Sequence, residues 1–399
     1  MTHGIAKNIL EGTREFARRL ASNSSRLTKL ARSAALLGAM SLSVTGSTGW
    51  GAEADVASSL AQVRKVGAKG AGHKEAVAAL QTLNRASVGE LPQILAAMDG
   101  ADALVTNWLR GVAETVAQRE LDKGGKLPVS QLEQFLVDTK HAPKARRLAY
   151  ELIARVDAQA EQRIIPGLIN DPSLELRRDA VALALAAAEK AGDDKAAAAK
   201  AYRTAFQSAR DLDQIKVAAT KLKELGEKVD LPQHMGFLMK WKVIGPFENA
   251  GGDGFQVAYP PEREYNASAE YDGKKDKVKW VDLETSDEYG TLDLNKLVGP
   301  HKGAIAYVYA EFESAKAVDA EFRLGTVNAN KIWVNGELLT TNHVYHSGSA
   351  IDQYIAPGKL KAGRNTILLK IAQNEQTEPW AQDWKFQFRV CDAIGTPIK

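Results

Sequence analysis

The hydrophobic pattern of this chain changes its period near residue 235, and that change constrains the fold more than any other feature. Before this point, "RRLAYELIARV" places Leu148, Leu152 and Val156 at i, i+4 and i+8, which is typical of an amphipathic helix. After this point, "VDAEFRLG" and "KFQFRV" alternate apolar and polar side chains, which is typical of antiparallel strands with one buried face. The sequence therefore predicts a helical part followed by a β-sandwich.

The aromatic residues are divided in the same way. Residues 236–399 hold five of the seven tryptophans and eight of the ten tyrosines, whereas residues 55–235 are rich in alanine and leucine. Aromatic residues favour strands, and alanine and leucine favour helices. We therefore expect a signal peptide over residues 1–54, a helical repeat domain over 55–235 and a β-sandwich domain over 236–399.

The first 54 residues have the layout of a secretory signal. They contain seven Lys or Arg residues and three Glu, then the apolar run "AALLGAMSLSV" and Ala52-Glu53-Ala54, which fits a cleavage site. The apolar run has about half of the ~20 residues that span a bilayer, so we expect no membrane span in the mature chain, beginning near Asp55. This predicts an exported protein, periplasmic or extracellular. The alternative is an amphipathic, disordered N-terminus on a cytoplasmic protein.

The charge of the remaining chain is balanced. It holds 45 basic and 46 acidic residues, a net charge of −1. This excludes a general electrostatic attraction to nucleic acid or anionic lipid, so we expect no nucleic-acid partner. The single cysteine, Cys391, cannot form an internal disulfide. We expect it to be a small apolar residue of the core rather than a reactive thiol.

Two segments of the helical part are related to each other. "APKARRLA" and "DPSLELRRDA" each run from Pro through a short spacer to Arg-Arg-x-Ala, and the two arginine pairs lie 31 residues apart. Over residues 144–191 this pattern resembles HEAT repeats, which implies an α-solenoid-like array. The segment "AYRTAFQSARDLDQIKVAATKLKELG" fits a tetratricopeptide-like helical pair almost as well, so the repeat family stays open.

The same segments support two local expectations. "INDPS" predicts a helix start with Asp171 as the N-cap and Pro172 at the first helical position. The paired arginines could form a phosphate or acidic-partner site, but surface charge clusters are usually solvated. We therefore expect them to lie at the polar start of each second helix and to pair with Glu151, Glu175 or Asp179.

The β part carries a recognisable order of motifs. "WKVIGPFENAGGDGFQVAYPPE" opens it, and "IWVNGELL", Asp352 and "LKAGRNTILLKI" follow. Over residues 237–398 this order resembles the galactose-binding-like jelly roll of the sugar-binding domains in β-galactosidase-type hydrolases. In those hydrolases the domain is typically accessory, which implies binding rather than catalysis.

The resemblance also assigns structural roles. Asn-Gly between apolar residues is the strongest short-range hairpin signal, so Asn335-Gly336 should form one turn. The resemblance implies that Gly363 and Asn365 form the next turn and that Trp333 packs between the sheets.

Two loops of the β part could bind a ligand. In "EPWAQDWKF", aromatic rings that could stack on a sugar lie beside groups that could hydrogen-bond it, and "NHVYHSGSAID" adds an amide and an imidazole. The candidate ligand-binding residues are Trp380, Gln382, Asp383, Trp384, Asn342 and His343. The alternative is that the tryptophans belong to the core.

The loop "ENAGGDG" is a candidate calcium site. Its oxygen ligands would be Glu248, Asn249 and Asp253, and we expect no other cofactor. The alternative is a flexible turn. His343 and His346, with Asp352, form a weaker metal candidate, because residues three apart on a strand point to opposite faces. The candidate metal ligands of the two sites are Glu248, Asn249, Asp253, His343, His346 and Asp352.

Common catalytic motifs are absent from the sequence: it has no C-x-x-C-H, H-E-x-x-H or G-x-S-x-G and no phosphate-binding glycine loop. We expect an exported, non-catalytic binding or scaffold protein whose sandwich contacts carbohydrate or an extracytoplasmic protein. Two alternatives stay open. One is an accessory or catalytic component of polysaccharide breakdown, and the other is a purely structural protein.

Overall fold

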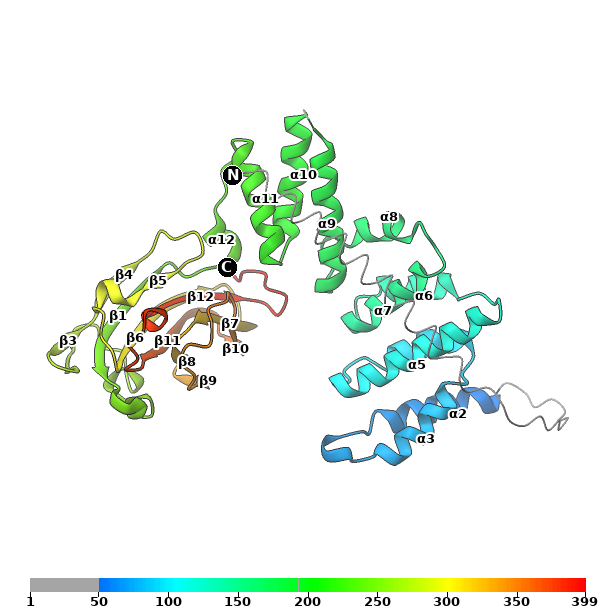
Figure 1. The fold of residues 1–399 in the computed structure, drawn as a ribbon, viewed down its shortest axis with the longest axis horizontal. Helices are drawn as coiled ribbons and strands as arrows, with labels where there is room; N and C mark the ends of the chain where they lie inside the picture. The colour runs from blue at the N-terminus through cyan, green and yellow to red at the C-terminus, as the bar shows by residue number, and fades with distance from the viewer. Residues whose placement is uncertain (1–49, 193) are drawn as a thin grey trace. The chain divides into compact units, whose positions relative to one another are not determined.

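The structure, a computed structural model, describes residues 50–192 and 194–399, with side chains from residue 55 onward. The chain divides into two units after residue 55, and the second unit, residues 56–399, is compact. The predicted signal peptide lies outside the described residues, except where helix α2 (Trp50–Val63) begins. The second unit has helices before residue 236 and antiparallel sheets after it (Figure 1), which confirms the predicted order of the helical and β parts.

The helical part consists of helices that follow one another along the chain. After α2 they are α3 (His73–Leu83), α4 (Leu91–Ala96), α5 (Ala103–Asp122), α6 (Val129–Val137), α7 (Pro143–Ala154), α8 (Ala160–Ile164), α9 (Leu174–Lys190), α10 (Lys195–Ser208), α11 (Leu212–Glu224) and α12 (Leu231–Met235). The 3-10 turns η1 (Ala68–Gly70), η2 (Val88–Glu90) and η3 (Ile165–Leu168) lie between some of them.

Several of these helices pack chiefly on helices close to them in sequence, as α6 does on α7 and α10 does on α9 and α11. Leu148 and Leu152 of α7 are fully buried, as predicted. Val156, expected on the same face, lies beyond the end of α7 and is exposed. Further along, the buried residues that join α9, α10 and α11 are Val181, Ala205, Ile215 and Ala218.

The start of α9 differs from the expectation. The helix begins at Leu174, and Asp171 is not its N-cap. The Asp171 carboxylate instead accepts from Ser173 N (2.7 Å) and from Arg146 Nη1 (2.8 Å). Both side chains of the Asp171–Arg146 ion pair are buried. Asp171 therefore connects the start of α9 to α7 through Arg146 and does not cap α9.

In both arginine pairs the first arginine is buried and the second is more exposed. The second member of each pair is exposed or half-buried: Arg147 pairs with Glu151 and Asp179, as predicted, and Arg178 pairs with Asp213. The first member is buried, contrary to the expected solvated face. Arg146 contacts Asp171, and Arg177 donates to the carbonyl groups of Asn170 and Asp171.

The β part contains two antiparallel sheets packed face to face. One has six strands in the order β4-β1-β6-β11-β8-β9, and the other has four in the order β10-β7-β12-β5. Their bounds are β1 (Lys240–Glu248), β4 (Val281–Glu284), β5 (Leu292–Asp293), β6 (Ala304–Ser314), β7 (Val318–Thr326), β8 (Ala329–Val334), β9 (Glu337–Asn342), β10 (Tyr354–Leu360), β11 (Gly363–Gln373) and β12 (Lys385–Cys391). The hairpin of β2 (Glu270–Asp272) and β3 (Lys277–Lys279) is separate, and α13 (Leu294–Leu297) follows β5.

The core between the sheets follows from the period-two alternation. Phe322 and Leu324 of β7 are fully buried with Ile367 and Leu369 of β11, while the residues between them, Arg323 and Leu368, face away from this core. Cys391 lies buried at the end of β12, and burial raises the pKa of its thiol to about 11. This agrees with the inert core residue expected from the sequence.

The Asn335-Gly336 turn joins β8 to β9, as predicted. Both residues have positive φ, 51° for Asn335 and 83° for Gly336, as the turn requires. Asn335 also bonds the neighbouring strand β11: its Nδ2 donates to Asn365 Oδ1 (2.8 Å), and its Oδ1 accepts from Thr366 N (3.1 Å). Gly363, with φ of 80°, starts β11 at the second expected turn.

Trp333 does not pack between the sheets, which corrects the expectation. Its neighbours Ile332 and Val334 face the inter-sheet core, so the alternation along β8 turns Trp333 to the outer face of the six-stranded sheet. There it lines a small cavity with Tyr309 and Leu368.

This outer face is covered by the segment between β1 and β4. The segment includes the 3-10 turns η4 (Ala250–Phe255) and η5 (Pro260–Glu262). Its aromatic residues pack onto those of the sheet: Tyr265 stacks on Tyr309 with 3.7 Å between ring centroids, and Tyr259 lies against Tyr307. A second apolar cluster therefore exists outside the sandwich core.

Hydrogen bonds join the helical and β parts. Arg389 Nη1 donates to Met235 O (3.1 Å), and Arg210 Nη2 donates to Thr396 Oγ1 (3.2 Å). Arg389 Nε also donates to Asp352 Oδ1 (2.7 Å). Helix α12 ends at Met235, beside the domain boundary predicted between residues 235 and 236, while residues 56–399 form one compact unit.

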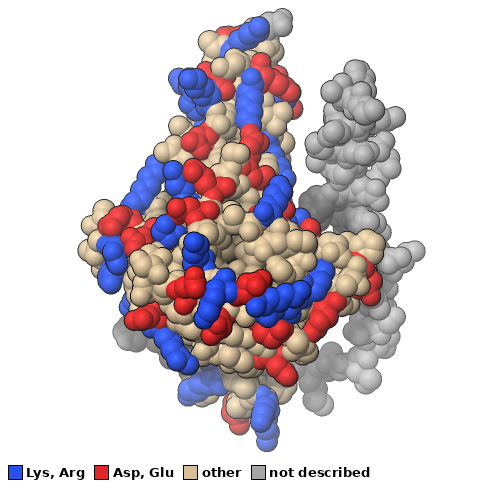
Figure 2. Space-filling view, turned by 90° about the vertical axis from the view of Figure 1, so that its left-hand side faces the viewer, with Lys and Arg blue, Asp and Glu red and all other residues tan. Residues whose placement is uncertain are grey.

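Among the described residues, no helix has the length and apolar character needed to cross a membrane. On the face that Figure 2 presents, Lys and Arg side chains lie interspersed with Asp and Glu. This mixing agrees with the balanced charge of the chain after residue 54. It gives no support to long-range attraction of a large polyanion.

Candidate functional site

Three loops that are distant in sequence place their aromatic side chains in one continuous row. Phe255 stacks on His343 (centroids 4.2 Å apart, planes at 14°), and His343 meets Tyr345 edge-on at 5.5 Å. Tyr345 lies 6.5 Å from His346, which meets Trp380 edge-on at 5.0 Å. We call these five residues the aromatic row. It joins the predicted ligand residues His343 and Trp380 through two residues that the sequence did not assign to ligand binding.

Hydrogen bonds hold the three loops together. Asn249 Nδ2 donates to Tyr345 Oη (3.1 Å) and to Gln373 O (3.0 Å), so the loop before Phe255 is fixed to both others. Gly251 N donates to the Glu375 carboxylate. His346 is held at both ends, because its backbone N donates to Val327 O (2.7 Å) and its Nε2 bonds Asn374 Oδ1 (3.0 Å). The row is therefore built into the fold.

Trp380 is the most exposed part of the row. It lies in η6 (Pro379–Ala381), and 61% of its surface is accessible. The loop around it is fixed from both sides. Gln382 Nε2 donates to Thr377 O (2.7 Å) and Glu378 O (3.0 Å), and Lys302 Nζ donates to Ala381 O (2.6 Å). An exposed indole on a fixed loop presents a preorganised apolar face.

The other predicted ligand residues have structural surroundings. Trp384 is fully buried in the inter-sheet core, and its Nε1 donates to Ile371 O (3.3 Å). It has no face left for a ligand, which corrects the expectation that both tryptophans would stack on a sugar. Asp383 pairs with Lys385 (2.8 Å). Gln382 caps its own loop, as described above. Asn342, at the end of β9, donates to Asn330 Oδ1 (3.0 Å).

In the candidate calcium loop, the Glu248 carboxylate is already hydrogen-bonded to other groups of the protein. Glu248 Oε1 accepts from Asn249 N (2.9 Å), Ala250 N (2.8 Å) and Lys274 Nζ (2.7 Å), and the Lys274 hydrogen bond is the main cause that lowers the pKa of this carboxyl. An ammonium group this close disfavours a second cation. Asn249 Oδ1 is buried and has no partner among the described residues, and Asp253 is exposed. The calcium site stays a prediction.

The weaker histidine candidate is not assembled. Asp352 is engaged by Arg323 and Arg389, while His343 and His346 are turned to Phe255 and Asn374. Within the described residues, no group of three or more His, Cys, Asp or Glu side chains is placed to hold a metal ion.

Known proteins offer only distant similarity. No protein-family model matches the chain, and no curated protein matches it. A β-glucosidase from Kluyveromyces marxianus in complex with glucose is similar over 38% of this chain and 16% of its own, with 10% identity and a TM-score of 0.24. A GH31 α-xylosidase from Xanthomonas citri is similar over 28% of this chain and 15% of its own, with 14% identity and a TM-score of 0.17. The chain thus spans less than a fifth of either structure, and similarity at this level carries no argument about the site.

Proposed function

We propose that this is an exported, non-catalytic binding protein whose β-sandwich binds carbohydrate along the aromatic row. The observation that carries the proposal is Trp380, exposed yet held edge-on by the anchored His346. The C–H faces of a sugar ring stack on aromatic rings, and neighbouring polar groups provide orientation. Here Glu375 and Gln376 lie in the same loop as Trp380. Phe255 is fully buried, so the ligand would contact the rings from His343 to Trp380, and this number of rings suits a ligand of more than one sugar unit.

The remaining parts have a proposed place in this function. We infer that the sandwich is a galactose-binding-like jelly roll and that the helical part is a HEAT-like or tetratricopeptide-like solenoid that serves as a scaffold. The solenoid assignment is supported by the repeated use of the arginine pairs, in which the first member is buried and the second reaches a carboxylate two helices further along the chain, from α7 to α9 and from α9 to α11. Export is supported by the charge, apolar run and cleavage-site order of residues 1–54.

A glycan array on the full chain, followed by calorimetry with the best oligosaccharide, tests the proposal. Trp380→Ala should weaken binding by about fivefold or more, because an aromatic contact contributes on the order of 1 kcal/mol. The matched control is Ile355→Ala, which removes an exposed apolar side chain from β10. Unchanged melting temperatures would show that both variants fold. If no glycan binds, or if Trp380→Ala binds as well as Ile355→Ala does, the proposal is wrong.

A further inference from the structure

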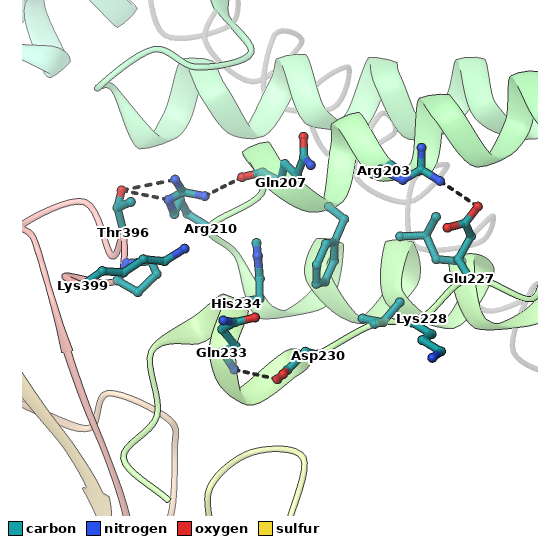
Figure 3. A pocket seen from close by; sticks show the side chains of 14 residues that line it. Arg203, Gln207, Arg210, Glu227, Lys228, Asp230, Gln233, His234, Thr396 and Lys399 are labelled. Carbon is teal, nitrogen blue, oxygen red and sulfur yellow. Dashed lines mark hydrogen bonds and ion pairs between the residues drawn. The ribbon is translucent and has the colours of Figure 1, made fainter.

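A cavity in another part of the molecule has the character of an anion site. It lies where α10, the loop before α12 and the segment after β12 meet, and its volume is about 470 Å³ (Figure 3). Four of its lining residues are basic: Arg203, Arg210, Lys228 and Lys399. The aromatic row contributes nothing to it, so the cavity is independent of the proposed sugar site. We call it the Arg210 pocket.

The acidic residues of the pocket are already engaged. Glu227 forms an ion pair with Arg203 (2.7 Å). Asp230 accepts from Gln233 N (2.9 Å) and thereby caps α12. Among the described residues, no carboxylate pairs with the side chains of the other three basic residues, which are Arg210, Lys228 and Lys399. With four basic and two acidic residues in its lining, the pocket carries a net positive charge.

Arg210 is held in place without an ion pair. Its Nη1 donates to Ala209 O (2.8 Å) and Gln207 O (3.1 Å), and its Nη2 donates to Thr396 Oγ1 (3.2 Å). Figure 3 shows the guanidinium between Gln207 and Thr396, facing the cavity. The pKa of Arg210 is lowered, mainly by burial. The positive charges of Arg177 and Arg389 lower it further, whereas the negative charge of Asp392 raises it. All three guanidinium nitrogens have neutral partners, since Nε also donates to Thr396 Oγ1 (3.3 Å), so these bonds hold the group in place but do not compensate its charge. An anionic ligand would compensate that charge.

Burial and nearby positive charges also lower the pKa of His234. Its ring stacks on Phe206, with 3.9 Å between centroids. Burial and then the positive charges of Arg210, Arg389 and Lys399 lower the pKa of His234 to about 4. The imidazole is therefore neutral at pH 7, and its surroundings disfavour added positive charge. An anion in the pocket would reverse that effect.

We propose that the Arg210 pocket binds a small oxyanion with two or more negative charges, such as a phosphorylated or polycarboxylated metabolite. The volume lies within the range of about 300–1,000 Å³ that is usual for small-molecule sites. Arg210 provides the fixed donor, and Lys228 and Lys399 provide mobile charges at the exposed rim. Arg203 is kept in place by Glu227 and forms the opposite wall.

Calorimetric titration of the full chain with tripolyphosphate and, separately, with citrate tests this assignment. Lys228→Gln and Lys399→Gln should each weaken the better anion by about fivefold, because one exposed ion pair contributes up to about 1 kcal/mol. The matched control is Lys200→Gln on α10, an exposed lysine that does not line the pocket. Neither lysine at the rim makes an internal ion pair in the described residues, so both variants should keep the wild-type melting temperature.

The pH dependence provides a second readout. A bound anion should raise the pKa of His234, and by linkage the protonation of His234 should then strengthen binding. Wild-type protein should therefore gain affinity relative to His234→Phe between pH 7 and pH 5, because phenylalanine keeps the stacking on Phe206 but does not titrate. Stronger binding of tripolyphosphate than citrate would indicate a phosphorylated ligand, and the reverse a carboxylated one. If neither anion binds, or if Lys200→Gln weakens binding as much as Lys228→Gln does, the proposal is overturned.

Discussion

Lys370 and Glu262, 108 residues apart in the chain, form a buried ion pair on the outer face of the six-stranded sheet, with 2.8 Å between Nζ and Oε1. Lys370 Nζ also donates to Phe255 O (2.9 Å) and Val257 O (2.8 Å). All three partners lie in the segment that contains η4 and η5, so a single lysine of β11 fastens this segment to the sheet. Because Phe255 starts the aromatic row, the same contacts position one end of the proposed sugar site.

The stability of the protein should depend on pH through Lys370. Burial is the main cause that lowers the pKa of Lys370 to about 8 from its usual 10.5, although Glu262 opposes it. Between these two values the unfolded chain holds a proton that the native chain has released, so stability rises with pH across this window. The gain should be on the order of 3 kcal/mol. Urea unfolding of wild type and Lys370→Met at pH 7.5 and 10.5 measures it. Parallel pH profiles for the two proteins would contradict the prediction.

Two of the aspartates that pair with arginines in the helical part, Asp171 and Asp213, should differ in their effect on stability. Asp171→Asn leaves Arg146 buried without a carboxylate and should cost about 3–5 kcal/mol in unfolding free energy. Asp213→Asn breaks an exposed pair with Arg178 and should cost less than about 1 kcal/mol. Urea unfolding of both variants decides the matter, and similar costs for the two would show that burial does not distinguish the pairs.

The fold was predictable where a local pattern decides it. The change of period near residue 235 and the Asn335-Gly336 turn are properties of short segments, and the structure has both. Local pattern could not decide which face of the six-stranded sheet lies inside, because the segment between β1 and β4 buries the outer face as well. For that reason Trp333 was assigned to the wrong side, and Trp384 was read as a loop residue although it is core.

The candidate site shows the same limit. Trp380 and His343 were recognised individually, because an aromatic residue beside polar groups is visible in the sequence. Their connection through Tyr345 and His346 was not, because it depends on strand pairings that bring three distant loops together. The aromatic "HVYH" segment followed by a glycine is the one local signal that could have suggested it.

The Asn335-Gly336 turn provides the last prediction, which separates structure from binding. Asn335→Ala should lower the unfolding free energy by about 1–2 kcal/mol, because alanine is strained at a φ of 51° and loses the bonds to Asn365 and Thr366. Glycan affinity should stay within twofold of wild type, since Asn335 makes no contact with the aromatic row. Trp380→Ala should show the opposite result, with lost affinity and an unchanged melting temperature, because its ring is exposed. Thermal melting and calorimetry of the two variants side by side measure both effects. A loss of affinity in Asn335→Ala at unchanged melting temperature would place the hairpin in the binding surface instead.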